Sequence, residues 1–400
     1  MATRLRMVER ARFAAMQASR ISATKYSARA AKASRRRDIA QPVNAPDGGK
    51  ALNAATESTC PAALAVTVIM PVYNGGTTLR QSLEPLLAMR RRGEIAQIIV
   101  VDDGSTDASA AIAAAAAVTV LESGGRLGPG GARNVGAAAA AGDVLWFVDA
   151  DVVVHADGAR VLVEALRRTG AAAVFGTYDD APPAPNFFSQ YKNLVHRYHH
   201  VRAGGDIDTF WAGCGAIASK AFADAGGFDA ARYPHSSIED IELGLRLRQR
   251  GLRIHLEPAL LATHLKVWHL ANLLHTEVYR RAIPWSQLII EQGWWSSKLN
   301  MDRGERFRAL LAACGLTALL LAAARVSPPW PALILFGLIA VANRRLFGYF
   351  RRRRGVRFAI GGLIYHQLYY LYSAAAFLYC LAAYRLPAVR RRRERRTHPA

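Results

Sequence analysis

The feature that most constrains the fold is a regular alternation of apolar, strand-like runs and helix-like segments between residues 66 and 176. The continuous run QIIVVD at 97–102 is typical of a strand that is buried on both faces. Such an alternation predicts an α/β fold, with a Rossmann-like, mostly parallel sheet covered by helices on both faces. The expected strands are 66–72, 97–102, 118–121, 144–149 and 172–176, and the expected helices are 77–92, 106–117, 131–141 and 157–169.

Acidic residues gather at the ends of the expected strands and on the segments that follow them. In an open α/β sheet, ligands bind outside the carboxyl ends of the strands, so these residues are the first candidates for a functional site. Two aspartates one residue apart can reach the same cation, and oxygen ligands suit Mg²⁺ or Mn²⁺, which also bridge phosphates. The clusters are Asp102 with Asp103, Asp149 with Asp151, and Glu239 with Asp240.

A glycine-rich segment opens the helix expected at 131–141. Its N–H groups and the helix dipole favour phosphate binding around Gly128, although a tight turn into the helix explains the same glycines. The segment lacks the GK[ST] ending of a P-loop, which argues against a nucleoside triphosphatase. Arg133 on this helix is a candidate ligand of a diphosphate, with a structural salt bridge as the alternative.

The positive charge of the chain is concentrated at its two ends. Residues 1–60 hold 12 Lys and Arg against 4 Asp and Glu, and residues 301–400 hold 18 against 3, whereas the residues between are nearly neutral. The C-terminal arginines flank apolar runs, a pattern that suits anionic lipid headgroups and argues against nucleic acid as a partner. The four cysteines have no zinc or disulfide spacing, which favours a reducing compartment.

Three apolar runs near the C-terminus, 309–324, 330–342 and 358–384, predict a region of two or three transmembrane helices. The first two runs are short for full spans, so a tight hairpin, a broken or re-entrant element and buried helices of a soluble domain stay open as alternatives. Residues 268–285 mix tryptophan, leucine and basic residues, which indicates an interfacial helix on a membrane, with a core helix as the alternative.

These patterns divide the chain into five parts. They are a basic leader at 1–62, a catalytic domain at 63–265, interfacial amphipathic helices at 266–305, transmembrane helices at 306–386 and a basic tail at 387–400.

Six motifs in the middle of the chain resemble, in order and spacing, those of family 2 glycosyltransferases, which share the GT-A fold. The resemblance covers about residues 66–265. The motifs are PVYN (71–74), VVDDGSTD (100–107), GPGGARNVG (128–136), FVDAD (147–151), GGFD (226–229) and IEDIELGLRL (238–247).

The resemblance implies a role for each matching residue. Asp240 is expected to be the general base, with Glu239 beside it, and Asp149, Asp151 and His264 are expected to hold a divalent metal, Mg²⁺ or Mn²⁺. Tyr73 is expected to pack on the nucleotide base, and Asp102 or Asp103 to hydrogen-bond it. The full set expected to bind the nucleotide sugar is Pro71, Tyr73, Asn74, Asp102, Asp103, Gly128, Arg133 and Asp149.

The resemblance therefore implies an inverting, metal-dependent glycosyltransferase that uses a UDP- or GDP-linked sugar. With the apolar C-terminal runs, it predicts a multi-pass protein of the cytoplasmic membrane whose catalytic domain faces the cytosol and whose acceptor is a lipid or is lipid-linked. The QxxRW motif of processive members is missing, which favours transfer of a single sugar. A polyprenyl-phosphate glycosyltransferase and an inactive, nucleotide-sugar-binding membrane scaffold stay open as alternatives.

Overall fold

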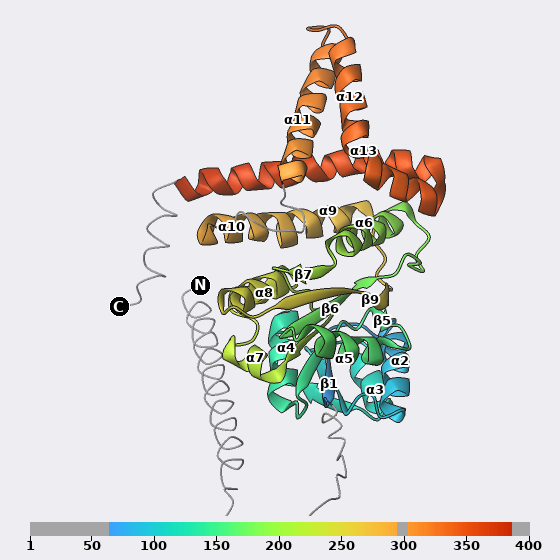
Figure 1. The fold of residues 1–400 in the computed structure, drawn as a ribbon, viewed down its shortest axis with the longest axis vertical. Coiled ribbons are helices and arrows are strands. Elements are labelled where there is room, and N and C mark those ends of the chain that lie inside the picture. Colours follow the sequence, from blue (N-terminus) through green and yellow to red (C-terminus); the bar gives the residue numbers. More distant parts are fainter. Residues whose placement is uncertain (1–63, 294–302, 386–400) are drawn as a thin grey trace, which may run out of the picture.

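The structure is a computed structural model that describes residues 64–293 and 303–385. The basic leader and the basic tail expected at 1–62 and 387–400 lie outside the described residues. Within the described ranges the molecule has three tiers (Figure 1). A sheet domain lies at one end, a layer of short helices covers it, and two of the C-terminal helices project from the other end as a hairpin.

The first four strands form the parallel half of the sheet, as the sequence predicts. Their order is β3-β2-β1-β4, and Val68 of the central strand lies between Ile98 and Trp146 of its neighbours. The connecting helix α3 begins at Ser109, later than expected, because the side chain of Asp107 accepts a hydrogen bond from the Ser109 N–H. The elements are β1 (Val66–Val72), α2 (Leu79–Arg91), β2 (Gln97–Asp102), α3 (Ser109–Ala115), β3 (Thr119–Glu122), α4 (Gly128–Ala139) and β4 (Val144–Val148).

The second half of the sheet is mixed. Strand β8 lies antiparallel between β4 and β6, and β9 pairs in parallel with β6 but antiparallel with β5 and β7. The sheet is therefore less parallel than expected, because the short strands β5, β7 and β8 pair antiparallel with their neighbours. The elements are β5 (Val152–Val154), α5 (Gly158–Thr169), β6 (Ala173–Tyr178), α6 (Phe187–Ala203), β7 (Gly205–Ile207), β8 (Cys214–Ala218), α7 (Ser219–Asp224), α8 (Glu239–Gln249) and β9 (Ile254–His264).

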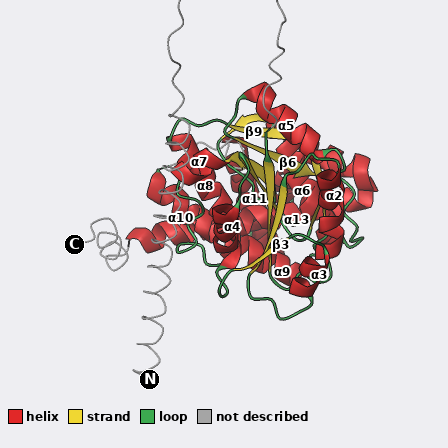
Figure 2. Cartoon of the chain, turned by 90° about the horizontal axis from the view of Figure 1, so that it is seen from below, coloured by secondary structure: helices red, strands yellow, loops and turns green. Residues whose placement is uncertain are grey.

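Helices cover both faces of this sheet (Figure 2). Along β4, Trp146 points into the core beneath α2 and α5, whereas the next residue, Phe147, points into the opposite core beneath α7 and α8. The ring of Phe147 lies 5.3 Å from that of Phe222 and 5.2 Å from that of Phe228. Burial of each such side chain contributes roughly 1.5–3 kcal/mol to the free energy of unfolding.

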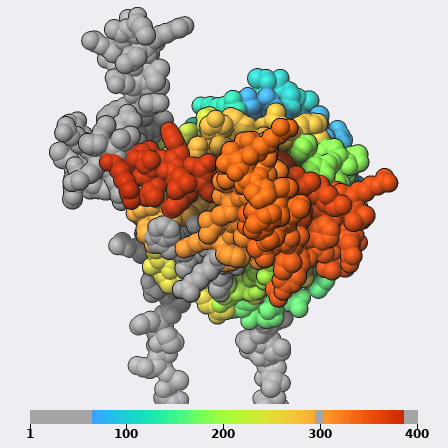
Figure 3. All heavy atoms as spheres, turned by 90° about the horizontal axis from the view of Figure 1, so that it is seen from above, coloured from blue at the N-terminus to red at the C-terminus, as the bar shows by residue number. Residues whose placement is uncertain are grey.

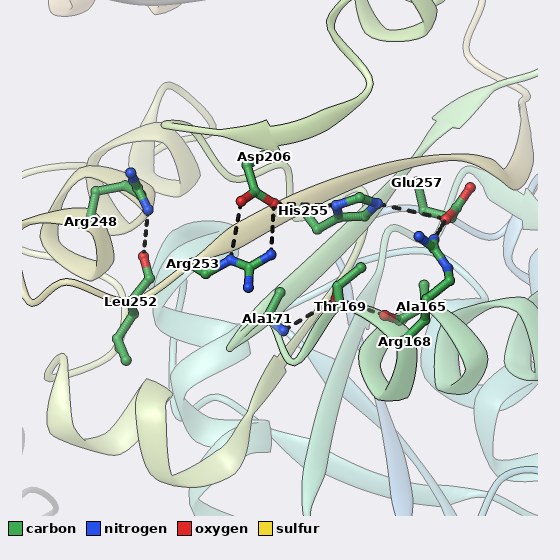
Figure 4. A network of polar contacts seen from close by, with 10 residues as sticks. All are labelled: Ala165, Arg168, Thr169, Ala171, Asp206, Arg248, Leu252, Arg253, His255 and Glu257. Atoms are coloured by element: carbon green, nitrogen blue, oxygen red, sulfur yellow. Dashed lines mark hydrogen bonds and ion pairs between the residues drawn. The ribbon is translucent and has the colours of Figure 1, made fainter.

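A chain of polar contacts ties the long strand β9 to its neighbours (Figure 4). Arg253 donates to Asp206 of β7 over 3.1 Å, and the ring of His255 lies between Asp206 and Glu257. Glu257 in turn accepts a hydrogen bond from Arg168 near the end of α5. These contacts tie the first part of β9 to β7 and α5.

A layer of three helices separates the sheet domain from the C-terminal helices. The helices α9 (Leu270–His275), η1 (Thr276–Ala282, a π-helix) and α10 (Ile283–Gln292) follow one another and lie beneath α13 (Arg344–Arg385), which is broken at Gly355. Trp268, Leu273 and Leu288 are buried. The segment expected to lie on a membrane thus packs one face against the rest of the protein, whereas Leu270 and Tyr279 on it are exposed.

The helices α11 (Arg303–Ala323) and α12 (Trp330–Ala342) form the projecting hairpin (Figure 1). Seen from above, the hairpin stands over the centre of the molecule and α13 extends to either side (Figure 3). Large apolar side chains are exposed on both hairpin helices, including Leu320 at 59% and Leu333 at 68%. In the described residues, Gly304–Ala323 is long and apolar enough to cross a membrane, and α12 with α13, bent by 71°, forms a second candidate. The described part of the chain thus contains one or two candidate spans, where the sequence predicts two or three.

Candidate functional site

The parallel strands bring the expected site residues to one edge of the sheet. Tyr73 and Asn74 follow β1, Asp102 and Asp103 lie at the end of β2, and Asp149 follows β4. Because these strands are adjacent and parallel, their carboxyl ends meet. The clusters identified in the sequence therefore converge on one site.

Asp103 anchors the glycine-rich loop. Its carboxylate is buried and accepts hydrogen bonds of 2.8 Å from the Ser123 hydroxyl and from the N–H groups of Leu127 and Gly128. Gly128 has a φ of +78°, and a Cβ there would lie 2.4 Å from the carbonyl oxygen of Pro234. The N–H of Gly128 therefore donates to Asp103 and not to a phosphate. A glycine is needed at this position because of the turn geometry.

The nucleotide-binding candidates at the end of β1 divide into supporting and exposed groups. Pro71 is a buried residue of β1, and the side-chain oxygen of Asn74 accepts a hydrogen bond of 2.8 Å from the Thr106 N–H, which holds the two loops together. The ring of Tyr73 is 40% exposed and carries the Arg126 guanidinium 3.9 Å above it. Asp102 accepts two long hydrogen bonds of 3.3 Å from the Ser105 N–H. Tyr73 and Asp102 are thus the groups that remain available to a ligand.

Arg133 links two of the acidic clusters. This buried side chain of α4 donates to Asp149 over 2.6 Å and to Glu239 over 3.2 Å. The second oxygen of Glu239 accepts from the Ser237 N–H at 2.8 Å, so both Glu239 oxygens are engaged inside the protein. Burial raises the pKa of Asp149, and the charge of Asp151 adds to this, although the Arg133 guanidinium opposes it. The salt-bridge interpretation of Arg133 is the one that the structure bears out.

Asp151 and His264 form the pair that best suits a divalent metal. The pairing of β5 with β9 places them side by side, with the carboxylate oxygen Oδ2 3.6 Å from the ring nitrogen Nε2. Burial alone would raise the pKa of Asp151, but His264 and the charge of Lys266 lower it and keep the carboxylate ionised. Tyr178 stacks on the His264 ring at 4.5 Å and fixes its orientation.

The described residues contain no group of three or more His, Cys, Asp or Glu side chains arranged to hold a metal. Asp149, expected as a third ligand, is turned toward Arg133. A carboxylate and an imidazole still fit Mn²⁺ or Mg²⁺, provided that a bound ligand or water supplies the remaining positions.

Asp240 has a different environment from the other carboxylates. It lies in the first turn of α8, is half-buried, and accepts a hydrogen bond of 3.1 Å from the Ala212 N–H in the loop before β8. Burial and the charge of Glu239 raise its pKa to about 6. A carboxylate with this pKa is suited to accept a proton near neutral pH. Cys214 in the next strand is buried with its pKa raised to about 12, so it is not a nucleophile.

The structure adds site residues that the sequence did not single out. Besides Arg126 and Tyr178, the π-helix contributes Glu277, which is buried and pairs with Lys192 of α6 at 2.5 Å and with Arg281 at 3.7 Å. The charge of Arg281 also lowers the pKa of Asp240. No motif marks these residues, because Lys192, the other partner of Glu277, is distant in the sequence; the π-helix is the feature that points to them.

Comparison with known proteins identifies the sheet domain. Residues 67–226, which contain the first eight strands, match the model of the family described as glycosyl transferase family 2. The chain carries a family 2 glycosyltransferase domain. A pre-mycofactocin glycosyltransferase of Mycobacterium tuberculosis is 30% identical over 220 residues, or 50% of this chain and 42% of the relative. The succinoglycan biosynthesis protein ExoO of Rhizobium meliloti is 34% identical over 117 residues, or 28% of this chain and 33% of the relative. The chain thus spans less than half the length of these curated relatives.

Solved structures show that the family 2 domain has the GT-A fold, as the sequence motifs imply. A mannosyltransferase from Pyrobaculum calidifontis, solved with GDP-Man and Mn²⁺, superposes with a TM-score of 0.53 at 19% identity. The superposition covers 79% of this chain and 87% of that protein, a larger share than residues 66–265 alone would give. The likeness of fold therefore extends beyond the sheet domain.

Proposed function

We propose that this protein is a membrane-anchored, metal-dependent, inverting glycosyltransferase that transfers a single sugar from a nucleotide-diphosphate sugar to a lipid or lipid-linked acceptor at the cytosolic face of a membrane. The observation that carries the proposal is the meeting of three groups at one edge of the sheet. They are the exposed Tyr73 ring, the Asp151–His264 pair, and the isolated carboxylate of Asp240.

The donor would lie along the carboxyl ends of β1, β2 and β4. Tyr73 would stack on the base in the place where Arg126 now lies, and Asp102 would accept its N–H groups. Asp151 and His264 would hold the divalent metal beside the diphosphate, as the GDP-Man and Mn²⁺ in the Pyrobaculum calidifontis mannosyltransferase suggest. Such a metal would neutralise the negative charge of the leaving diphosphate. Arg133 keeps Asp149 and Glu239 fixed at the margin of this site.

Asp240 would remove the proton from the acceptor hydroxyl. Its pKa of about 6 makes it ionised at neutral pH yet basic enough to accept a proton as the new glycosidic bond forms. Attack from the side opposite the diphosphate inverts the anomeric carbon. Glu239 cannot share this task, because both its oxygens are hydrogen-bonded inside the protein.

The hairpin supports a membrane-bound acceptor. Its exposed leucines form no packed core with the sheet domain, and they would enter the hydrocarbon region of a bilayer. The layer of α9, η1 and α10 lies between the hairpin and the sheet domain, so an acceptor would reach Asp240 from that side.

One observation favours a second candidate, a polyprenyl-phosphate glycosyltransferase. Among the described residues, Arg281 and Lys192 both pair with Glu277, and these two cations beside Asp240 would suit an anionic acceptor. A phosphate acceptor needs no general base. Retained activity in Asp240→Asn would therefore select this candidate over a hydroxyl acceptor.

The test is to incubate the purified full chain with a panel of nucleotide sugars, with and without lipid extract, and to measure the release of nucleoside diphosphate. Asp240→Asn should reduce transfer by roughly 10²–10⁴-fold while donor binding survives. Asp224→Asn is the matched control, because Asp224 is exposed on α7 and pairs only with Lys220 among the described residues. If Asp240→Asn loses donor binding together with transfer, Asp240 is a donor ligand and the assignment is wrong.

The metal has a separate test. A chelator should abolish transfer, and Mn²⁺ or Mg²⁺ should restore it. Asp151→Ala should lower turnover by roughly a hundredfold or more, because the charge of the leaving group then loses its stabilisation. Full activity in a chelator would contradict a metal-dependent mechanism.

A further inference from the structure

A groove lined by arginines lies between α6 and the first turns of α13, away from the site just described. Its volume is about 510 Å³, which is in the size range of small-molecule binding sites. Tyr198, Val201 and Tyr349 supply its apolar walls. The guanidinium groups come from both helices: Arg197 and Arg202 from α6, and Arg344, Arg345, Arg352 and Arg353 from α13.

The groove has a large excess of positive charge. Among the described residues, Arg353 is the one groove arginine that forms an ion pair, with Asp180. Arg197 donates to the backbone carbonyl of Tyr178, and Arg344 to that of Val341. Neutral partners of this kind leave the charge of the guanidinium groups uncompensated. Six arginines in one open groove therefore favour an anionic ligand with several acceptor oxygens, of which phosphate is the prime example.

The position of the groove indicates where that phosphate comes from. Arg344 and Arg345 follow directly after α12, at the base of the apolar hairpin. A small adjoining pocket continues from Arg202 and Arg345 to Arg308 of α11, which is paired there with Glu305, so the groove reaches the base of the hairpin. If the hairpin enters a bilayer, its base lies at the depth of the lipid headgroups, where basic pockets bind anionic lipids.

We propose that this groove binds the phosphate-bearing headgroup of an anionic phospholipid, such as phosphatidylglycerol. The proposal rests on the membrane insertion of the hairpin proposed above. The tyrosines and Val201 would contact the glycerol and the first methylene groups of the lipid, which a free phosphate lacks. Through Arg197 the groove contacts the Tyr178 backbone, and the Tyr178 ring stacks on His264. A bound lipid would thus hold the catalytic domain in a fixed orientation on the membrane.

The test uses the purified full chain in detergent micelles and follows the thermal unfolding midpoint as dioleoyl phosphatidylglycerol or dioleoyl phosphatidylcholine is added. Arg345→Gln with Arg352→Gln removes two groove arginines that are exposed and form no ion pair in the described residues. We expect the apparent dissociation constant for phosphatidylglycerol to rise roughly tenfold to thirtyfold. Arg352→Gln alone should raise it about fivefold, which covers the case that the double variant folds poorly.

The matched control is Arg351→Gln with Arg357→Gln, which removes the same charge from α13 outside the groove, at positions on either side of the break at Gly355. This variant should bind phosphatidylglycerol within about twofold of the unaltered protein. Equal weakening in both double variants would show a diffuse charge effect and overturn the site. The same midpoint shift with inorganic phosphate would overturn the lipid assignment, as would the absence of any difference between the two lipids.

Failure of this proposal can be told apart from failure of the proposed function. If the hairpin does not insert, the unaltered chain appears in the soluble fraction of cells. If only the groove is wrong, the chain stays in the membrane fraction and releases nucleoside diphosphate from its donor, but shows no preference for phosphatidylglycerol.

Discussion

Single residues of the site show two ways of keeping a carboxylate inside a protein. Asp149 and Glu239 are held by Arg133, which compensates their charge at 2.6 and 3.2 Å. Within the described part of the chain, Asp240 accepts hydrogen bonds from the Ala212 and Ile241 N–H groups alone, and its pKa rises to about 6. The first arrangement fixes structure, and the second leaves a group that can exchange a proton.

The pKa of Asp240 predicts the pH dependence of turnover. A general base acts in its ionised form, so kcat should be constant above about pH 7 and fall as the pH drops through about 6, by roughly tenfold per unit below that value. Steady-state kinetics from pH 5 to pH 8 with saturating substrates would measure this. In Asp240→Asn the residual activity should lose this dependence, and an unchanged profile would assign the titration to another group.

Removal of Arg133 should destabilise the domain. Arg133→Gln leaves the buried Glu239 and the partly buried Asp149 without a cation, which costs roughly 3 kcal/mol of unfolding free energy. The thermal midpoint should then fall by roughly 6–12 °C. Arg92→Gln breaks an exposed ion pair with Glu94 and should leave the midpoint nearly unchanged. Equal effects of the two substitutions would contradict a structural role for Arg133.

The sequence named the candidate residues of the site but not their partners. Motif order pointed to Asp149, Asp151, Asp240 and His264, which the structure places at the same edge of the sheet. It did not show that the Asp103 carboxylate accepts hydrogen bonds from the glycine-rich loop, or that Asp149 faces Arg133. Those contacts depend on side-chain directions that only the assembled fold sets.

Among the elements, the glycine-rich turn before α4 has the strictest geometry. Gly128 combines a φ of +78° with a Cβ position 2.4 Å from the Pro234 carbonyl oxygen, whereas Gly124, at +81°, has open space around it. Gly128→Ala should therefore cost roughly 2–4 kcal/mol of unfolding free energy, and Gly124→Ala about 1 kcal/mol from the backbone alone. Chemical denaturation of the two variants would compare them. A Gly128→Ala variant as stable as Gly124→Ala would show that the turn adapts.

Elements with a strong local pattern were predictable and those without one were not. The strands expected at 66–72 and 97–102 match β1 and β2, because long β-branched runs are buried on both faces there. By contrast, β8 is only CGAIA, and it owes its place to the strands on either side of it. The π-helix likewise has no sequence signature; it packs against α13, and its Glu277 pairs with Lys192 of α6.

At the scale of the whole molecule, the hairpin determines how deeply, and in which orientation, the protein would insert into a membrane. Its first helix is long enough to cross a bilayer, but the 13 residues of α12 would reach only about 20 Å, less than the ~30 Å of hydrocarbon. We expect the hairpin to enter and return without exposing its tip on the far side, with α13 along the surface. After replacement of the native cysteines, neither Val326→Cys at the tip nor Val356→Cys on α13 should react with an impermeant thiol reagent in intact cells. Val356→Cys should react once the membrane is opened. External labelling of Val326→Cys would show two full crossings.

The place of β9 in the sheet has a consequence for how the chain is made. This strand pairs with β5, β6 and β7, and its last residue is His264, so the sheet and the site are both incomplete until it is added. It also precedes the apolar helix α11 in the chain. Because domains fold as units in the order of synthesis, the catalytic domain can complete its folding before the hairpin leaves the ribosome. If synthesis pauses after β9, the sheet domain would already be folded when the apolar hairpin emerges. The long-range strand pairings, which form most slowly, would then be completed away from the lipid.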